Sequence, residues 1–167
     1  MKHYQVKSAD TSHFWLTQDD PEIGRLEYDS GFSFKAKITL ADHAQYAVQP
    51  KGFWGTTIEI KEQEQVLLDF QMDWKGQILV RTAFDADEAY CIFKQKGLLK
   101  NTFLLLDQEK MELLNIEPDF KWSSMNDSYQ LVASDAFEQL PRKELLLLMA
   151  VHCANYYVNM MASAVAM

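Results

Sequence analysis

The sequence predicts a mainly β protein, a closed antiparallel β-barrel of about twelve strands with a helix at the C-terminal end. The first observation is a series of short apolar or alternating segments, separated by turn-like segments, that continues to residue 133. The second is the segment 145–167, which contains no Asp, Glu, Lys or Arg. A closed barrel is favoured over an open sheet because closure leaves no unpaired edge strand.

The clearest predicted strand is "FSFKAKITL" at residues 32–40, in which every second residue from Phe32 to Leu40 is apolar. This period of two places one face in the core and the other face, with Lys35 and Lys37, in water. No long helical window competes with the strands before Ser134. Further strands are expected at residues 13–17, 24–28, 44–48, 56–61, 66–72, 77–82, 89–94, 102–107, 111–116 and 129–134.

The strand segments also repeat along the chain. "GFWGTTIEIKEQEQVLLDFQMDWKGQILV" begins at Gly52, and "GLLKNTFLLLDQEKMELLNIEPDFKWSSMNDSYQLV" begins at Gly97. Each contains an apolar pair after Lys-Gly, a strand, a charged turn, a second strand, an Asp-aromatic-Lys segment and a third strand. A weaker copy begins at Phe14. A spacing of about 40 to 45 residues indicates a meandering sheet built from similar modules.

Residues 141–167 are expected to form one helix, because Pro141 suits a first helical turn. Ser134 and Asp135 suit the cap of a short preceding turn at 136–140. The uncharged part of the helix would be roughly 34 Å long at 1.5 Å per residue, which is enough to cross a bilayer. Arg142 and Lys143 before the apolar run also suit a membrane anchor. A tail-anchored protein with a cytoplasmic β domain is therefore one interpretation.

A polar stripe on this helix favours burial inside the protein instead. His152, Asn155, Asn159 and Ser163 are spaced by three, four and four residues, which places them in an arc of roughly 80° on one face. These side chains are unfavourable against hydrocarbon, whereas inside a protein they can bond to backbone or water. A helix that is apolar on nearly all sides is also typical of a buried position.

A repeated β-meander followed by a hydrophobic C-terminal helix resembles the tubby-like superfamily, which includes the tubby C-terminal domain, the LURP-one-related proteins and the phospholipid scramblases. The resemblance rests on "KGFW", "VLLDFQMDWKG", "KGLL", "MELLNIEPDFKW" and "KELLLLMAVHCANYYVNMM", within modules that cover most of the chain. It lies in the pattern and order of elements rather than in a specific motif. In that family a twelve-stranded barrel encloses the last helix. The resemblance therefore implies a single domain over residues 1–167, with strands in 1–133 and a helical tail at 134–167 packed as a barrel plug.

The functions of the resembling proteins differ. Tubby domains bind phosphoinositide headgroups through cationic residues, scramblases are linked to calcium and lipid movement, and many LURP-one-related proteins have no known activity. None of the family's functional residues can be placed on this sequence. A cationic patch is expected from Lys35, Lys37 and Lys51, because a headgroup phosphate needs clustered cations and hydrogen-bond donors. The alternative is an ordinary solvated strand face that carries lysines.

Composition restricts the partners and the compartment. A formal net charge of −8 argues against nucleic acid as the main partner, and it lowers the attraction to anionic membranes. Cys91 and Cys153 lie in apolar sequence without metal-ligand spacing, which is typical of small buried residues in a reducing compartment. Residues 1–15 contain no apolar signal segment. These observations predict a cytoplasmic protein.

Metal sites are weakly indicated. The acidic segments 19–22 and 85–88 offer oxygen ligands for calcium, but neither has the loop length or the glycine of an EF-hand. His3, His13 and His43 are scattered without metal-ligand spacing. The sequence therefore predicts no metal site and no cofactor.

Catalytic motifs are absent: the sequence contains no GxSxG, GxxxxGK[ST] or HExxH, and no GxGxxG opens a helix. His152 and Cys153 are neighbours on a helix and point about 100° apart, so they do not form a base and nucleophile pair. No catalytic residue is predicted. The tryptophans are expected to cover the ends of the barrel core rather than to stack on a ligand: Trp15, Trp54, Trp74 and Trp122.

The sequence thus predicts a non-enzymatic barrel that binds a lipid headgroup or a partner protein at its rim. Two alternatives stay open. One is the tail-anchored membrane protein described above. The other is a hollow carrier of a small apolar ligand, similar to a lipocalin, in which the helical tail packs outside the barrel.

Overall fold

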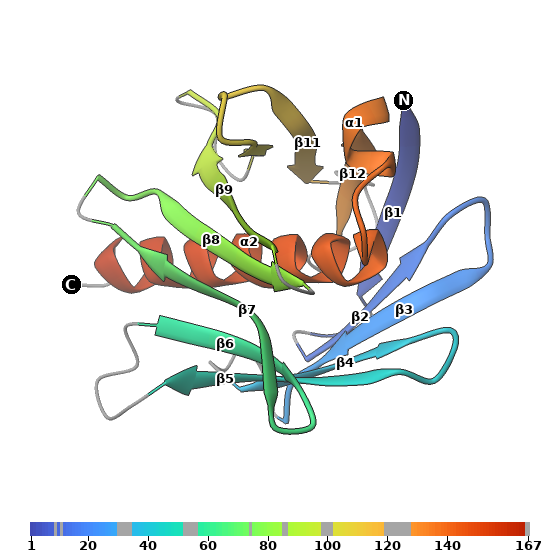
Figure 1. Ribbon diagram of the computed structural model, residues 1–167. Helices are drawn as coiled ribbons and strands as arrows, with labels where there is room; N and C mark the ends of the chain where they lie inside the picture. The colour runs from blue at the N-terminus through green and yellow to red at the C-terminus, as the bar shows by residue number, and fades with distance from the viewer. Residues whose placement is uncertain are drawn as a thin grey trace.

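Antiparallel strands form a closed barrel, with one long helix drawn across the centre of the view in Figure 1. The computed structural model describes residues 1–8, 10, 12–29, 35–51, 57–73, 75–84, 87–97, 102–118 and 128–165, and it describes no side chain at 87 or at 161–165. The described residues contain twelve strands: β1 (Lys2–Ser8), β2 (His13–Thr17), β3 (Glu22–Glu27), β4 (Ala36–Leu40), β5 (Gln45–Lys51), β6 (Thr57–Glu62), β7 (Gln65–Met72), β8 (Ile78–Phe84), β9 (Asp87–Gln95), β10 (Phe103–Leu106), β11 (Glu112–Pro118) and β12 (Tyr129–Ala133).

The strands follow one another round the barrel in sequence order, and β1 closes it by pairing with β12. In this closing pair Lys2 lies opposite Ala133, and Val6 lies opposite Tyr129. The sequence analysis does not predict β1, although its Tyr4 and Val6 are buried. Because β1 pairs with β2 on its other side, the sheet presents no open edge. The prediction of a closed antiparallel barrel, mostly β with a C-terminal helix, is confirmed.

The sequence repeat corresponds to a structural repeat. The copies that begin at Phe14, Gly52 and Gly97 contain the three-stranded meanders β2–β4, β6–β8 and β10–β12. The strands between them, β5 and β9, and the closing strand β1 join these meanders into one sheet. Residues 52–56 of the second copy, including Trp54, and residues 98–101 of the third copy, including Leu98, lie outside the described residues.

The inward faces of neighbouring strands form the core. Leu26 lies opposite Ile38, and Val48 lies opposite Ile60, and all four side chains are at most 1% exposed. The predicted alternation in the strand at 32–40 is confirmed for its described part, where Ile38 is buried and Lys37 is exposed. Burial of these branched and aliphatic side chains is the main source of stability for such a barrel.

The C-terminal region contains a short helix, α1 (Asp135–Glu138), and a long helix, α2 (Lys143–Val165). Ser134 caps α1 as predicted, because its hydroxyl oxygen accepts a hydrogen bond from the Phe137 amide at 3.2 Å. The expected start of the long helix at Pro141 is wrong. Arg142 has a φ of 56°, which lies in the left-handed region, so the right-handed helix begins only after it.

The first part of α2 is buried, since residues 145–154 are at most 3% exposed. The helix packs against β3 and β4. The closest approach is at Gly24 in β3, where an added Cβ atom would lie 2.7 Å from Leu148 Cδ1 and 3.3 Å from the Thr39 carbonyl oxygen. The proximity of the helix therefore favours glycine at this position, because a larger residue would displace the Leu148 side chain.

We expect Gly24→Ala to lower the free energy of unfolding by about 1 to 3 kcal/mol, because the new methyl group overpacks this contact. Urea unfolding followed by circular dichroism measures the change. Leu148→Ala serves as the second single variant, and it removes the Cδ1 atom that the new methyl group meets. The double variant should then lose less stability than the sum of the two single changes. Fully additive losses would contradict the proposed contact.

Candidate functional site

The predicted cationic patch lies on β4 and β5. Lys35 directly precedes β4, Lys37 lies within β4 opposite Ala47, and Lys51 is the last residue of β5. All three side chains are exposed. The structure therefore brings the three predicted lysines to neighbouring strands, but Lys35 and Lys51 lie at one end of the barrel, whereas Lys37 lies further along its outer wall.

Strand direction shows which other lysines lie at this end. In an antiparallel meander every second connection lies at the same end of the sheet. The connections after β3, β5, β7 and β9 therefore share one end of this barrel. We call their described lysines the lysine rim: Lys35, Lys51, Lys75 and Lys96. Lys96 is half-buried, and the other three are exposed.

Three exposed carboxylates, Asp10, Asp29 and Asp73, lie at the same end as the lysine rim, and two of them are held in local turns. Asp73 Oδ1 accepts hydrogen bonds from the backbone amides of Lys75 at 2.8 Å and Gln77 at 3.0 Å. Asp10 Oδ1 accepts from the amides of Ser12 and His13. The Ser12 amide and the His13 ring, which also bonds to this carboxylate, lower the pKa of Asp10 to about 2. Each of these two carboxylates thus stabilises its own connection.

The opposite end of the barrel is acidic. The connections after β2, β4, β6 and β10 lie there, and they carry exposed carboxylates at Asp19, Asp20, Asp42, Glu64 and Glu109. The described cations at that end include Lys2, Lys110 and Arg142, which are also exposed. The two ends of the barrel therefore differ in electrostatic character, although the formal net charge of the whole chain is −8.

The helix α2 runs from the acidic end to the lysine rim. At its start, Arg142 Nη1 lies 3.4 Å from the hydroxyl of Tyr46, near the β4–β5 connection. Further along, the Tyr157 ring lies 5.4 Å from the ring of Phe103, the first residue of β10. Burial decreases towards this end, because residues 156–158 are half-buried and Met160 is 43% exposed. The C-terminal end of α2 thus emerges at the lysine rim.

Three members of the predicted polar stripe belong to a bonded network. The Tyr28 hydroxyl lies 2.7 Å from His152 Nδ1 and accepts a bond from Asn155 Nδ2 at 3.3 Å. The Tyr129 hydroxyl donates to Asn155 Oδ1 at 2.9 Å. Asn159 Nδ2 donates to the Asn155 carbonyl oxygen at 2.7 Å. The side chain of Ser163 lies outside the described residues. This network satisfies polar atoms inside an apolar core.

His152 is fully buried between aromatic rings. Its ring stacks on Tyr28 with centroids 5.6 Å apart, and it meets the edge of Phe70 at 5.7 Å. Desolvation lowers the pKa of His152 to about 3, so the ring is neutral at physiological pH. Burial also raises the pKa of the neighbouring Cys153 thiol. These shifts oppose the charged forms that base and nucleophile chemistry would use.

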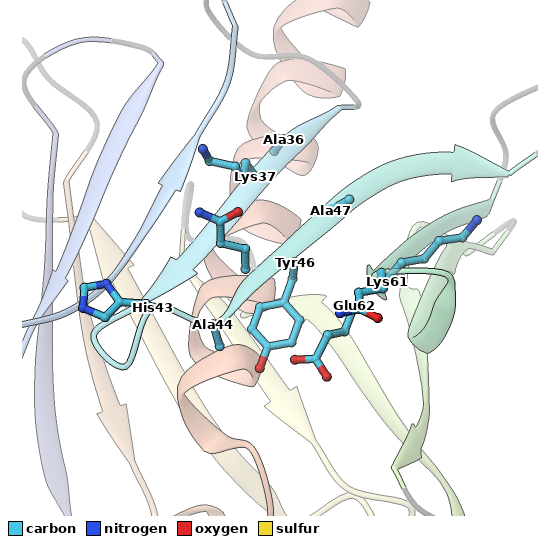
Figure 2. A pocket seen from close by; sticks show the side chains of 10 residues that line it. Ala36, Lys37, His43, Ala44, Tyr46, Ala47, Lys61 and Glu62 are labelled. Carbon is cyan, nitrogen blue, oxygen red and sulfur yellow. The ribbon is translucent and has the colours of Figure 1, made fainter.

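A groove of about 640 Å³ lies on the outer wall over β4, β5 and β6. Lys37 and Lys61 lie on either side of Ala47 in the same cross-strand row. Figure 2 shows that their ammonium groups extend away from each other and that Glu62 lines the same groove. Diverging cations beside a carboxylate are poorly arranged to bind one anionic group.

The remaining candidates offer no shared site. In the acidic segment 19–22, Glu22 forms an ion pair with Arg25 at 2.7 Å. In the segment 85–88, Asp85 and Ala86 lie outside the described residues. His13 contacts Asp10 at 3.1 Å and stacks on Trp15. Within the described ranges, no group of three or more His, Cys, Asp or Glu residues is placed to hold a metal ion.

Sequence reasoning missed Lys75 and Lys96 as candidate binding residues. They are far from Lys35 and Lys51 in sequence, Lys75 stands alone in its segment, and Lys96 lies between Lys94 and Lys100. The order of the strands could have identified them. In an antiparallel meander every second connection lies at the same end of the barrel, so Lys75 and Lys96 can be placed at the end that carries Lys35 and Lys51. Lys37 shares a sequence segment with Lys35, and both line the same hollow with Asp29, but Lys37 lies within β4 rather than in a connection.

Comparison with known proteins gives no relative: no family model, no curated protein and no solved structure matches this chain. Among the residues that the structure describes, no helix has both the length and the apolar character needed to cross a membrane.

Proposed function

We propose that the chain is a single barrel domain of the tubby-like type, in which α2 is a central helix enclosed by the strands as a plug. Support comes from the burial of residues 145–154 and from contacts to α2 by Tyr28, Phe70, Phe103 and Tyr129. These residues belong to or follow strands spaced round the barrel. The proposed compartment is the cytoplasm, since Cys91 and Cys153 are free thiols.

The proposed function is non-enzymatic binding of an anionic lipid headgroup at the lysine rim. The observation that carries it is the contrast between the two barrel ends: one has four lysines in or beside its connections together with Asp10, Asp29 and Asp73, and the other has mainly exposed carboxylates. An anionic surface attracts the first end and repels the second, so the barrel would be oriented on binding. The overall charge of −8 therefore does not oppose the proposal, because only one end approaches the surface.

A carrier of a small apolar ligand is less well supported. Such a carrier needs an interior cavity lined by inward side chains. Buried side chains of α2, including Leu147, Met149 and Val151, are packed into the same core cluster as the inward residues of the strands. Binding at the outer rim needs no such cavity.

We expect the protein to float with vesicles that contain phosphatidylserine and not with vesicles of phosphatidylcholine alone. Lys51→Glu should weaken this binding at least ten-fold, because each lysine near an anionic surface contributes about 1 kcal/mol and the substitution also adds a repelling charge. Lys110→Glu is the matched control, since it makes the same change at an exposed lysine of the acidic end. Equal losses in both variants, or equal flotation with neutral vesicles, would contradict the proposed site.

A further inference from the structure

The C-terminal end of α2 is uncharged and becomes exposed at the site proposed for lipid binding, where its exposed described side chains are Asn159 and Met160. Met160 is 43% exposed, whereas residues 145–154 of the same helix are at most 3% exposed. The helical backbone continues to Val165. In sequence, no Asp, Glu, Lys or Arg occurs between Leu145 and Met167. We call residues 156–165 the helix tip.

Backbone chemistry permits the helix tip to enter an apolar layer. A helix satisfies its own amide and carbonyl groups internally apart from its last four carbonyl groups, which at the boundary of a bilayer can still bond to water and headgroups. An exposed methionine gains free energy when it leaves water. The charges that would oppose insertion are absent from the tip, and the nearest described cations of the rim suit the headgroup layer above the acyl chains.

We propose that the helix tip inserts into the boundary between headgroups and acyl chains of an anionic bilayer while the lysine rim contacts the headgroups. This inference rests on the proposed lipid-binding function and adds an apolar contact to its electrostatic one. The two contacts are continuous, because Tyr157 packs against Phe103 and lies beside Gly76 in the β7–β8 connection that also carries Lys75. Electrostatic attraction orients the barrel, and the tip then anchors it.

Only the helix tip can insert, because the preceding part of α2 is buried in the protein. The residues before it, 145–154, belong to the protein core, so they are not available to lipid unless the barrel opens. Two types of contact at one surface are expected to reinforce each other, as for a single lipid chain combined with a basic patch. Screening by salt should remove the electrostatic contact but leave part of the apolar one.

A fluorescent label at Met160 tests the insertion directly. Met160→Cys is labelled with an environment-sensitive dye, and Met111→Cys is the matched control, because Met111 is 63% exposed at the acidic end of the barrel. The native Cys91 and Cys153 are buried, which protects them from the label in the folded protein. On phosphatidylserine vesicles we expect a blue shift and quenching by nitroxide lipids for the label at 160, and neither for the label at 111.

The outcomes separate the inference from the proposed function. Flotation without a change at position 160 would overturn insertion and leave headgroup binding in place. No flotation would overturn the headgroup proposal itself. A blue shift at 160 that appears with protein concentration and without vesicles would show that a second copy of the chain covers the tip, which also overturns insertion. A shift that needs anionic vesicles supports the inference.

A charge substitution gives an independent test of the same contact. Met160→Glu should weaken vesicle binding roughly five-fold or more, because a carboxylate resists transfer to the interface. Met111→Glu introduces the same charge away from the surface and should change binding little. Near-ultraviolet circular dichroism of both variants checks that the barrel is intact. Equal binding by the folded Met160→Glu protein would contradict a role for the tip.

Discussion

A chain that ends at residue 140 is expected to lose the native fold completely. The truncation removes α2, whose residues 145–154 are all buried in the core. Deleting one large core side chain typically costs about 2 to 5 kcal/mol, and the total stability of a domain is about 5 to 15 kcal/mol. Removal of ten neighbouring core positions, 145–154, therefore exceeds any stability that the strands alone retain.

Expression of the full chain and the 1–140 chain without detergent, followed by near-ultraviolet circular dichroism, measures this effect. The full chain should give fixed aromatic signals, and the truncated chain should aggregate or lose them. A chain that ends at residue 160 is the control, because it removes only the last residues and keeps every residue of α2 that the structure describes as buried. A folded 1–140 chain beside a full chain that requires detergent would instead support the tail-anchor interpretation.

The strands of this barrel are largely predictable because its two faces differ so clearly. The period-two pattern locates β2 at residues 13–17 without error and fixes the inward position of Ile38. The pattern fails for β1, where Lys2 and His3 precede Tyr4 and Val6 and leave too short an alternation. β1 is stabilised by pairing with β12, which lies more than 120 residues away in the sequence. A pattern in the local sequence contains no information on such a distant contact.

The candidate site is only partly predictable. Sequence proximity identifies Lys35, Lys37 and Lys51, but the position of a lysine at an end or on a wall depends on the register of each strand. The polar stripe of α2 is visible in the spacing of His152 and Asn155. Its partners Tyr28 and Tyr129 come from opposite ends of the strand sequence, so only the closed fold brings them together.

The buried His152 makes acid destabilisation the second large expected effect. Its pKa is lowered to about 3 in the fold by desolvation, whereas an exposed histidine titrates near pH 6.5. Between these two values the unfolded state binds more protons than the folded state, so stability is lost as the pH falls below about 6.5. The loss is roughly 1.4 kcal/mol per pH unit, or about 2 kcal/mol at pH 5.

His152→Phe isolates this contribution. Phenylalanine keeps a ring beside Tyr28 and Phe70 and cannot be protonated, and the Tyr28 hydroxyl retains its bond from Asn155. Urea unfolding between pH 7 and pH 5 should show a smaller loss of stability for the variant than for the native protein, by about 2 kcal/mol. Other titrating groups affect both proteins equally and cancel in this difference. Parallel pH profiles would mean that His152 accepts a proton in the folded state as readily as in the unfolded chain, which would contradict the desolvation that lowers its pKa.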